Sequence, residues 1–488
     1  MRRLLALALL TATPVTPVVA QSSALQSGRA QPITAQERRQ GAEANAGITA
    51  EYGGALTGRQ AAYVEGVGRR IATQSGLAAS PGAFNVTLLN SPVDNAFAIP
   101  GGYVYVTRNL VALMNDEAEL AAVMGHEVGH VAARHSRSRQ ETARNYQLGG
   151  LLGQTVLGAI LGNGGGLLGN VLNRAVQAAP QFLTLRFSRG QETQADDLAI
   201  RYLASAGYDP LALSTMLESL AAQTTLQGRL RGEARSLPEW ASTHPDPASR
   251  VRRAAEQAAK VQTTSRTRNR DAFLAAIDGM MYGEDPAQGV IEGRTFLHPQ
   301  LGIAFDVPQG FTMQNGAQAV SIQGQSAQAQ FSTAPLRGDL DAYLATVLRG
   351  LGGGASQAGA QRTTVNGIPA AYAQTRARSG NTPVDVTVFA YQLSPTKAVH
   401  FTALAPAGRG AGALESSFGS LRRLSASQAA AIRPRFVRVV AVRSGDTPAS
   451  LSARMAYPDY RLERFLVLNR LERDAALRPG DKVKLVTY

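Results

Sequence analysis

One stretch constrains the fold of this chain more than any other. Residues 115–140 form a continuous run without proline, in which apolar residues recur at helical spacing. The run contains H-E-V-G-H at positions 126–130. Because residues four apart lie on the same face of a helix, His126 and His130 can offer two imidazoles to one metal ion. Glu127 lies one step round the helix, so we expect it to reach a water molecule beside the metal rather than the metal itself.

This arrangement is the one that zinc hydrolases build from H-E-x-x-H, but a catalytic zinc usually has three protein ligands. The stretch 187–207 can supply the third, because Glu192 and Asp196 are again four residues apart on a predicted helix. We expect Glu192 to be the third ligand. Asp196 is better placed to hold a ligating histidine in the required tautomer. The two stretches together predict a Zn²⁺ site.

Four motifs in a fixed order resemble one family of enzymes. They are H-E-V-G-H, S-R-G-Q-E-T-Q-A-D at 188–196, N-A-F-A-I-P-G-G-Y-V-Y-V-T at 95–107 and S-T-H-P-D-P-A-S-R at 242–250. This combination resembles the HtpX/BepA/Oma-type zinc metallopeptidases, which are gluzincins related to the CAAX-prenyl endopeptidase. The resemblance covers residues 36–260 and implies a mainly helical, zincin-type domain with a small sheet.

Two apolar runs on either side of Pro-Gly-Gly at 100–102 predict a hairpin next to the zinc helix. Its first strand carries Ala96, Phe97, Ala98 and Ile99, and an extended peptide can add to an exposed strand edge through its backbone. The resemblance implies that these four residues are the substrate strand. An ordinary hairpin of the core is the alternative, and the two readings are compatible.

The expected chemistry assigns further residues. Zinc lowers the pKa of a water ligand towards about 7, and Glu127 is then the expected general base. His244 and Arg250 are the candidate donors to a developing oxyanion. The resemblance also implies that His244 can approach the zinc and block it. Alternatively, His244 caps a turn and Arg250 pairs with Asp196 or another carboxylate. His135 is off the ligand face and is expected to lie behind the ligands or at the surface.

The N-terminus and the composition indicate the compartment. Residues 1–20 combine two arginines, a short apolar run and a small residue at Ala20, which predicts a cleaved signal peptide and a periplasmic or otherwise exported protein. The absence of cysteine excludes cysteine proteases, thiolate zinc sites, disulfide scaffolds and a lipoprotein anchor. The net charge of +14 fits attraction to anionic surfaces or a solvated, arginine-rich surface. Scattered arginines and 6% aromatic residues disfavour nucleic-acid binding.

The segment between the two zinc helices is apolar but interrupted. Residues 147–170 contain many glycines and several polar side chains, so a membrane-spanning helix is not expected. A mobile lid, a segment that enters a membrane interface and a helical hairpin packed on the protein are the open interpretations. Peripheral contact with a membrane therefore stays open.

A chain of 488 residues is expected to contain several domains, here of the α+β class. We predict the peptidase domain at 36–265, in which one helix ends near Ala222 and the last begins at Pro247, and a linker with one short helix over 260–290. Strand-like segments, a tight hairpin turn at Asn366-Gly367 and helical segments at 339–351 and 412–424 predict an antiparallel α+β domain at 292–425. Residues 436–488 run strand, helix, helix, strand and resemble a LysM-like module. That resemblance implies peptidoglycan binding, and an accessory packing role is the alternative.

The leading hypothesis is an exported zinc-dependent endopeptidase that hydrolyses peptide bonds of unfolded or misassembled cell-envelope proteins. The substrate class rests on the resemblance alone. The alternative is an envelope chaperone or a peptidoglycan-associated binding protein. An aminopeptidase is less favoured, because the sequence identifies no acidic pocket for a free amino terminus.

Overall fold

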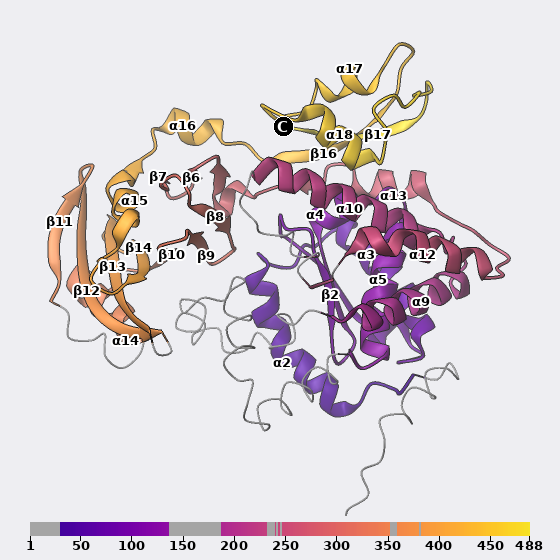
Figure 1. Ribbon diagram of the computed structural model, residues 1–488, viewed down its shortest axis with the longest axis horizontal. Helices are drawn as coiled ribbons and strands as arrows, with labels where there is room; N and C mark the ends of the chain where they lie inside the picture. Colours follow the sequence, from indigo (N-terminus) through magenta and orange to yellow (C-terminus); the bar gives the residue numbers. More distant parts are fainter. Residues whose placement is uncertain are drawn as a thin grey trace, which may run out of the picture.

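The computed structural model describes residues 30–135, 187–231, 240, 243–244, 246–351, 359–379 and 382–488. Figure 1 shows a helical part beside a β-rich part, with the C-terminal segment lying across the helices. The predicted signal peptide and the segment 147–170 lie outside the described residues. Within the described ranges, no helix combines the length and the hydropathy needed to cross a bilayer.

The helical part is built on a three-stranded sheet in the order β1-β3-β2. The strands are β1 (Asn85–Leu89), β2 (Ala96–Ile99) and β3 (Tyr103–Thr107). β1 and β3 are parallel, whereas β2 and β3 form the predicted hairpin. Gly101 and Gly102 have φ angles of 97° and 87° in its turn, which residues with a Cβ rarely adopt. β2 is thus the last strand on one side of the sheet, and it packs against helix α5 (Glu117–Ala132).

Helix α5 is central to this part. The helices are α2 (Ala35–Glu51), α3 (Arg59–Ala72), α4 (Arg108–Leu113), α5, α9 (Arg189–Ser205), α10 (Ala212–Arg231), α12 (Pro247–Lys260) and α13 (Arg270–Ile277). Of these, α3, α9, α10 and α13 pack on α5. Every residue of α5 except Val131 is buried, as expected for a helix with apolar residues on all sides. Asp116 caps its first turn by accepting a hydrogen bond of 2.9 Å from the backbone N–H of Glu119. α10 runs well beyond its predicted end near Ala222.

Two antiparallel sheets make up the β-rich part. Their orders are β11-β12-β13-β14-β10-β9-β8 and β15-β7-β6-β5. The strands are β5 (Val290–Glu292), β6 (Thr295–His298), β7 (Ile303–Asp306), β8 (Thr312–Asn315), β9 (Ala319–Gln323), β10 (Gln328–Pro335), β11 (Gln361–Val365), β12 (Ile368–Ser379), β13 (Thr382–Ser394), β14 (Lys397–Pro406) and β15 (Arg422–Arg423). Phe305 of the smaller sheet packs on Phe331 and Phe401 of the larger, with ring centroids 4.8 and 4.9 Å away. The predicted α+β class is confirmed.

Two of the local predictions for this part agree with the structure, and one does not. Asn366 and Gly367 both have positive φ, 47° and 76°, and join β11 to β12 in the predicted tight turn. Helix α14 (Leu340–Gly350) lies where the sequence predicts a helix. The second predicted helix, from residue 412 to 424, is too long. Helical structure there is the 3-10 helix Gly412–Leu414 followed by the short helix α15 (Glu415–Ser420), and it ends at Ser420 because the following arginines pair with β7 as strand β15.

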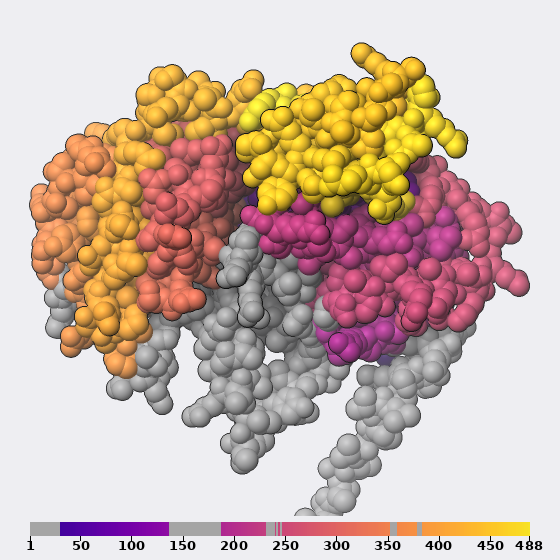
Figure 2. All heavy atoms as spheres, turned by 45° about the horizontal axis from the view of Figure 1, so that its top comes forward, coloured from indigo at the N-terminus to yellow at the C-terminus, as the bar shows by residue number. Residues whose placement is uncertain are grey.

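The last part of the chain has the predicted order of elements. After helix α16 (Ala426–Ala431) come β16 (Arg435–Ala441), α17 (Pro448–Ser452), α18 (Arg461–Asn469) and β17 (Lys482–Thr487). We call residues 435–488 the C-terminal module. The predicted linker is corrected, because it contains not only α13 but also β4 (Met281–Tyr282), which pairs with β16. Figure 2 shows the module against the helices of the first half of the chain. Its likeness to LysM modules stays a prediction.

Candidate metal centre

The centre is formed where α5 crosses α9. Two glycines of α5 let the helices approach: a Cβ on Gly129 would lie 3.2 Å from the carbonyl oxygen of Ala195. A Cβ on Gly125 would lie 3.6 Å from the Cα of Ala199. The capping box of Ser188 and Gln191 sets the start of α9 at Arg189, three residues before Glu192. The close crossing brings the α5 histidines against the acidic face of α9.

The predicted metal-binding residues converge, and His244 joins them. The Nε2 atoms of His126 and His130 are 3.0 Å apart. His244 Nδ1 lies 2.9 Å from Glu192 Oε1 and 3.4 Å from His126 Nε2. One donor atom from each of the four residues lies within 4.8 Å of the other three, and all four side chains are buried. Ligands of a tetrahedral zinc are roughly 3.3 Å apart when each is about 2.0 Å from the ion, so this donor set fits zinc.

The protonation states also suit a metal. Burial lowers the pKa of His130 well below its ordinary value, and it lowers the pKa of His244 to about 4. Both imidazoles are therefore neutral at pH 7, which is the form that binds a metal. Burial alone would raise the pKa of Glu192, but the surrounding histidines outweigh it and hold this pKa well below the usual range. The cluster thus offers three imidazoles and one carboxylate.

Asp196 and Arg250 lie directly behind the cluster. Asp196 Oδ1 is 2.9 Å from His126 Nδ1, where a carboxylate can hold the ring with Nε2 towards the metal. Arg250 donates to both oxygens of Asp196, with Nε 2.8 Å from Oδ2, and it also contacts Glu192. Arg250 therefore faces these carboxylates, which is the alternative to an oxyanion donor in the sequence interpretation. Burial would raise the pKa of Asp196, but the guanidinium and His126 lower it overall.

Glu127 and His135 complete the surroundings. Glu127 is buried, with Oε1 3.6 Å from His244 Nε2. It is thus on the side of the cluster where His244 enters. His135 is also buried: its Nδ1 is 2.8 Å from His130 Nδ1, and its Nε2 is 3.0 Å from Gln194 Oε1. Of the two positions expected for His135, the structure selects the one behind the ligands.

Sequence reasoning missed two aromatic residues that pack around the cluster. Phe187 stacks on the ring of His130, with centroids 3.6 Å apart, and Trp240 stacks on His244 at 4.1 Å. The backbone N–H of Trp240 donates to the carbonyl of Asp94. The Asp94 carboxylate in turn accepts hydrogen bonds from the side-chain amides of Asn109, Gln223 and Gln227. The one available signal was that Trp240 is the only tryptophan and lies four residues before His244.

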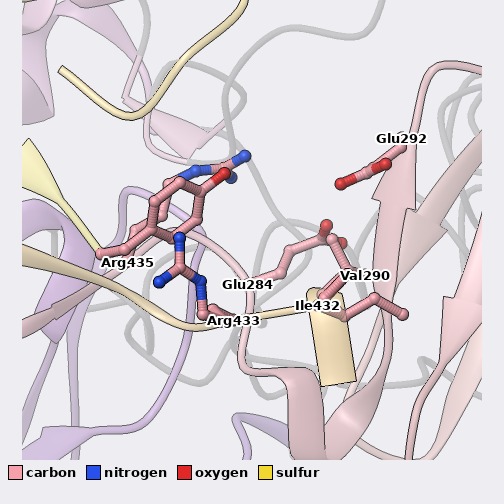
Figure 3. A pocket seen from close by; sticks show the side chains of 8 residues that line it. Glu284, Val290, Glu292, Ile432, Arg433 and Arg435 are labelled. Carbon is pink, nitrogen blue, oxygen red and sulfur yellow. The ribbon is translucent and has the colours of Figure 1, made fainter. Parts of the chain in front are cut away.

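A surface pocket lies elsewhere. Figure 3 shows it between β5 and the segment before β16, with Glu284 and Glu292 near Val290, and with Arg433 and Arg435 on the opposite wall. None of its lining residues belongs to the metal cluster. The pocket is therefore separate from the candidate centre.

Comparisons with known proteins agree with this geometry. Residues 58–258 match the model of peptidase family M48. The beta-barrel assembly-enhancing protease of Yersinia pestis is 31% identical over 229 residues, which are 46% of this chain and 44% of that protein. The mitochondrial metalloendopeptidase OMA1 of Arabidopsis thaliana is 36% identical over 163 residues, or 33% and 29% of the two chains. The chain thus spans less than half the length of these relatives. Residues 58–258 are a peptidase family M48 domain, and the buried cluster of His126, His130, Glu192 and His244 suits the zinc that metallopeptidases of this family use.

Proposed function

We propose that the chain is an exported zinc endopeptidase that hydrolyses peptide bonds of unfolded or misassembled cell-envelope proteins. The observation that carries the proposal is the buried donor cluster of His126, His130 and Glu192 with Glu127 at its side. The substrate class is supported by the printed name of the Yersinia pestis relative, which refers to β-barrel assembly. A periplasmic location is supported by the signal-peptide pattern of residues 1–20.

Each residue has a distinct role in this proposal. Zinc, when bound by His126, His130 and Glu192, supplies a Lewis acid that polarises the scissile carbonyl and acidifies water. Glu127 takes the proton of the attacking water and later delivers it to the leaving amine. Asp196 holds His126, and Arg250 is assigned a positioning role because it neutralises the two buried carboxylates.

The proposed substrate position is the edge of β2. A peptide in extended conformation would add to this strand as a further strand and present one peptide bond to the cluster. Two facts support this assignment: β2 is the last strand in the order of its sheet, and it packs against α5. Backbone pairing selects extended chains rather than a particular side chain, which suits unfolded substrates.

His244 is proposed to close the resting centre. Catalytic zinc sites keep one position open, whereas structural sites have four protein ligands. The described cluster has four donors, because His244 Nδ1 lies among the other three. Cleavage would then require His244 to leave and to make room for substrate. Once displaced, His244 remains a candidate donor to the oxyanion.

The four-donor cluster is also compatible with a second candidate function, that of a binding protein. A permanently closed centre would fit an envelope chaperone or a peptidoglycan-associated binding protein better than an enzyme. The order of elements in the C-terminal module supports the peptidoglycan part of this alternative. Contact with a membrane surface is supported only by the net positive charge.

The test compares wild type, Glu127→Gln and His244→Ala for zinc content and for cleavage of casein, an unfolded protein. We expect all three to retain zinc, wild type to cleave, Glu127→Gln to lose cleavage by a factor of about 10² or more, and His244→Ala to change the rate. Zinc in all three proteins without any cleavage would reject the endopeptidase and favour the binding protein. Absence of zinc from wild type would reject the centre itself.

A further inference from the structure

The C-terminal module is built into the peptidase domain rather than tethered to it. Its strand β16 pairs with β4, and the backbone of Val437 exchanges hydrogen bonds with Gly279 and Met280. The Val437 side chain is fully buried in the same hydrophobic core as α5. Helix α18 packs against α10 and α4. The module is therefore a neighbour of the helix that carries the metal-binding histidines.

Lys484 of the module is buried against the peptidase domain. No part of its side chain is exposed. Its Nζ donates to the carbonyl oxygens of Ala112, Leu113 and Met114, at 2.7, 3.3 and 2.5 Å. These carbonyls belong to the C-terminal end of α4, where a helix has no acceptor partners of its own. Three carbonyl acceptors match the three N–H donors of the ammonium form, while burial lowers the pKa of Lys484 well below its ordinary value.

The backbone of Lys484 is held as firmly as its side chain. Asn469, the last residue of α18, accepts a hydrogen bond of 2.7 Å from the Lys484 N–H. Its amide also donates to the Lys484 carbonyl at 2.9 Å. Both groups of Asn469 are thus used inside the module. The position of Lys484 is therefore set by the module, and a shift of the module would move the ammonium group.

A second contact reaches α5 itself. Arg470, directly after α18, pairs with Oε1 of Glu119, whose side chain is fully buried in the first turn of α5. Glu119 also accepts hydrogen bonds from the hydroxyl of Thr215 and from the backbone N–H of Asn115. Asn115 is part of the short segment between α4 and α5. Lys484 therefore contacts the end of α4, and Arg470 contacts the start of α5. Together they hold both sides of the α4–α5 junction.

This junction leads directly into the helix that carries His126 and His130. A helix is stiff along its axis, so a displacement of the first turn of α5 carries His126 and His130 with it. Their partner Glu192 is on α9, which is not attached to the module by these contacts. A metal site tolerates changes of only about 0.2 Å in its ligand distances. Small movements at the junction would thus change the distances between the metal-binding atoms.

We propose that Lys484 and Arg470 are positioning residues of the metal centre. By holding the α4–α5 junction, they set the position of the α5 histidines relative to α9, and the docked C-terminal module becomes a determinant of zinc affinity. The inference rests on the proposed ligand set but not on peptide cleavage.

The test uses the full-length chain and two readouts other than activity. Zinc affinity is measured by competition with a chromogenic chelator, and hydrogen exchange is followed for the amides of α5. Lys484→Met keeps the length of the side chain and removes its three N–H donors. Arg470→Met is the second variant, since Arg470 is half-buried and its loss is less of a threat to folding. The matched control is Leu451→Ala, which weakens the module's own core without touching either contact.

We expect Lys484→Met and Arg470→Met each to lower zinc affinity by about tenfold, as the loss of groups that support metal ligands typically does. Exchange should rise in the first turns of α5 in both variants. Leu451→Ala should raise exchange in the module and leave zinc affinity unchanged. In a Glu119→Gln background, Arg470→Met should have no further effect.

The inference would be overturned if both methionine variants bound zinc as tightly as wild type, or if their faster exchange were confined to residues 435–488. Equal losses in Leu451→Ala and Arg470→Met would also overturn it, because general weakening of the module would then explain both. These outcomes do not depend on whether the protein cleaves casein. A failure here and a failure of the proposed endopeptidase are therefore distinguishable.

Discussion

The glycine inside H-E-V-G-H offers a sharp test of how the centre is assembled. In Gly129→Ala, the new Cβ would lie 3.2 Å from the Ala195 carbonyl oxygen and 3.3 Å from Leu198 Cβ. Ordinary contacts begin at 3.4 Å, so α9 must move by a few tenths of an ångström. Alanine favours the helix by about 1 kcal/mol, and overpacking costs about 1–3 kcal/mol. The free energy of unfolding should therefore fall by only about 0–2 kcal/mol.

Gly129→Ala should lower the zinc affinity more than it lowers the free energy of unfolding. The required shift of α9 exceeds the tolerance of about 0.2 Å for metal–ligand distances, and it moves Glu192 away from both α5 histidines. We expect zinc affinity to fall by at least about tenfold in a chelator competition, while urea unfolding of the metal-free protein changes little. Gly125→Ala is the matched control, because its Cβ would meet α9 at ordinary distances of 3.6 and 3.7 Å, and its one tight contact, 3.3 Å from Ile71 Cγ1, is with a side chain of α3 rather than with α9. Equal zinc affinities for wild type and both variants would refute the argument that the close crossing sets the centre.

Three further predictions follow. In the metal-free protein, Arg250→Met should lower the free energy of unfolding by about 3–5 kcal/mol, because two buried carboxylates lose their cation. Urea unfolding measures this change. The control is Arg252→Met, whose unfolding should match wild type because the Arg252 side chain is 92% exposed. Burial lowers the pKa of His400 from 6.5 to about 4, so the unfolded chain binds more protons between these values. The His400 contribution to the stability of the β-rich part should be complete above about pH 6.5 and fall by about 2–3 kcal/mol at pH 4.5, read from hydrogen exchange of β14. His400→Gln should remove this part of the pH dependence, and a variant whose stability falls as steeply as that of wild type would contradict the prediction. Truncation after residue 425 should lower the thermal unfolding temperature of the peptidase domain, and an unchanged temperature would show that the docked module contributes nothing to it.

Local patterns predicted much of the fold. The hairpin of β2 and β3, the start of α12 at Pro247 and the turn at Asn366 and Gly367 all depend on residues that are adjacent in the chain. Predictions failed where a neighbour distant in sequence decided the structure. Met281 and Tyr282 have no strong strand signal, but pairing with β16 makes them a strand. The predicted helix after residue 412 ends early because its arginines pair with β7.

The sequence by itself determined which side chains can meet a metal. Spacing of four residues places His126 and His130 on one face of a helix, and Glu192 and Asp196 on one face of another, whatever the rest of the chain does. Only the tertiary structure decided that His244 stands among them, that Arg250 faces carboxylates, and that the C-terminal module reaches α5. Those contacts join segments more than fifty residues apart. Helical periodicity is a local property, whereas the packing that selects such partners depends on how the whole chain buries its apolar surface.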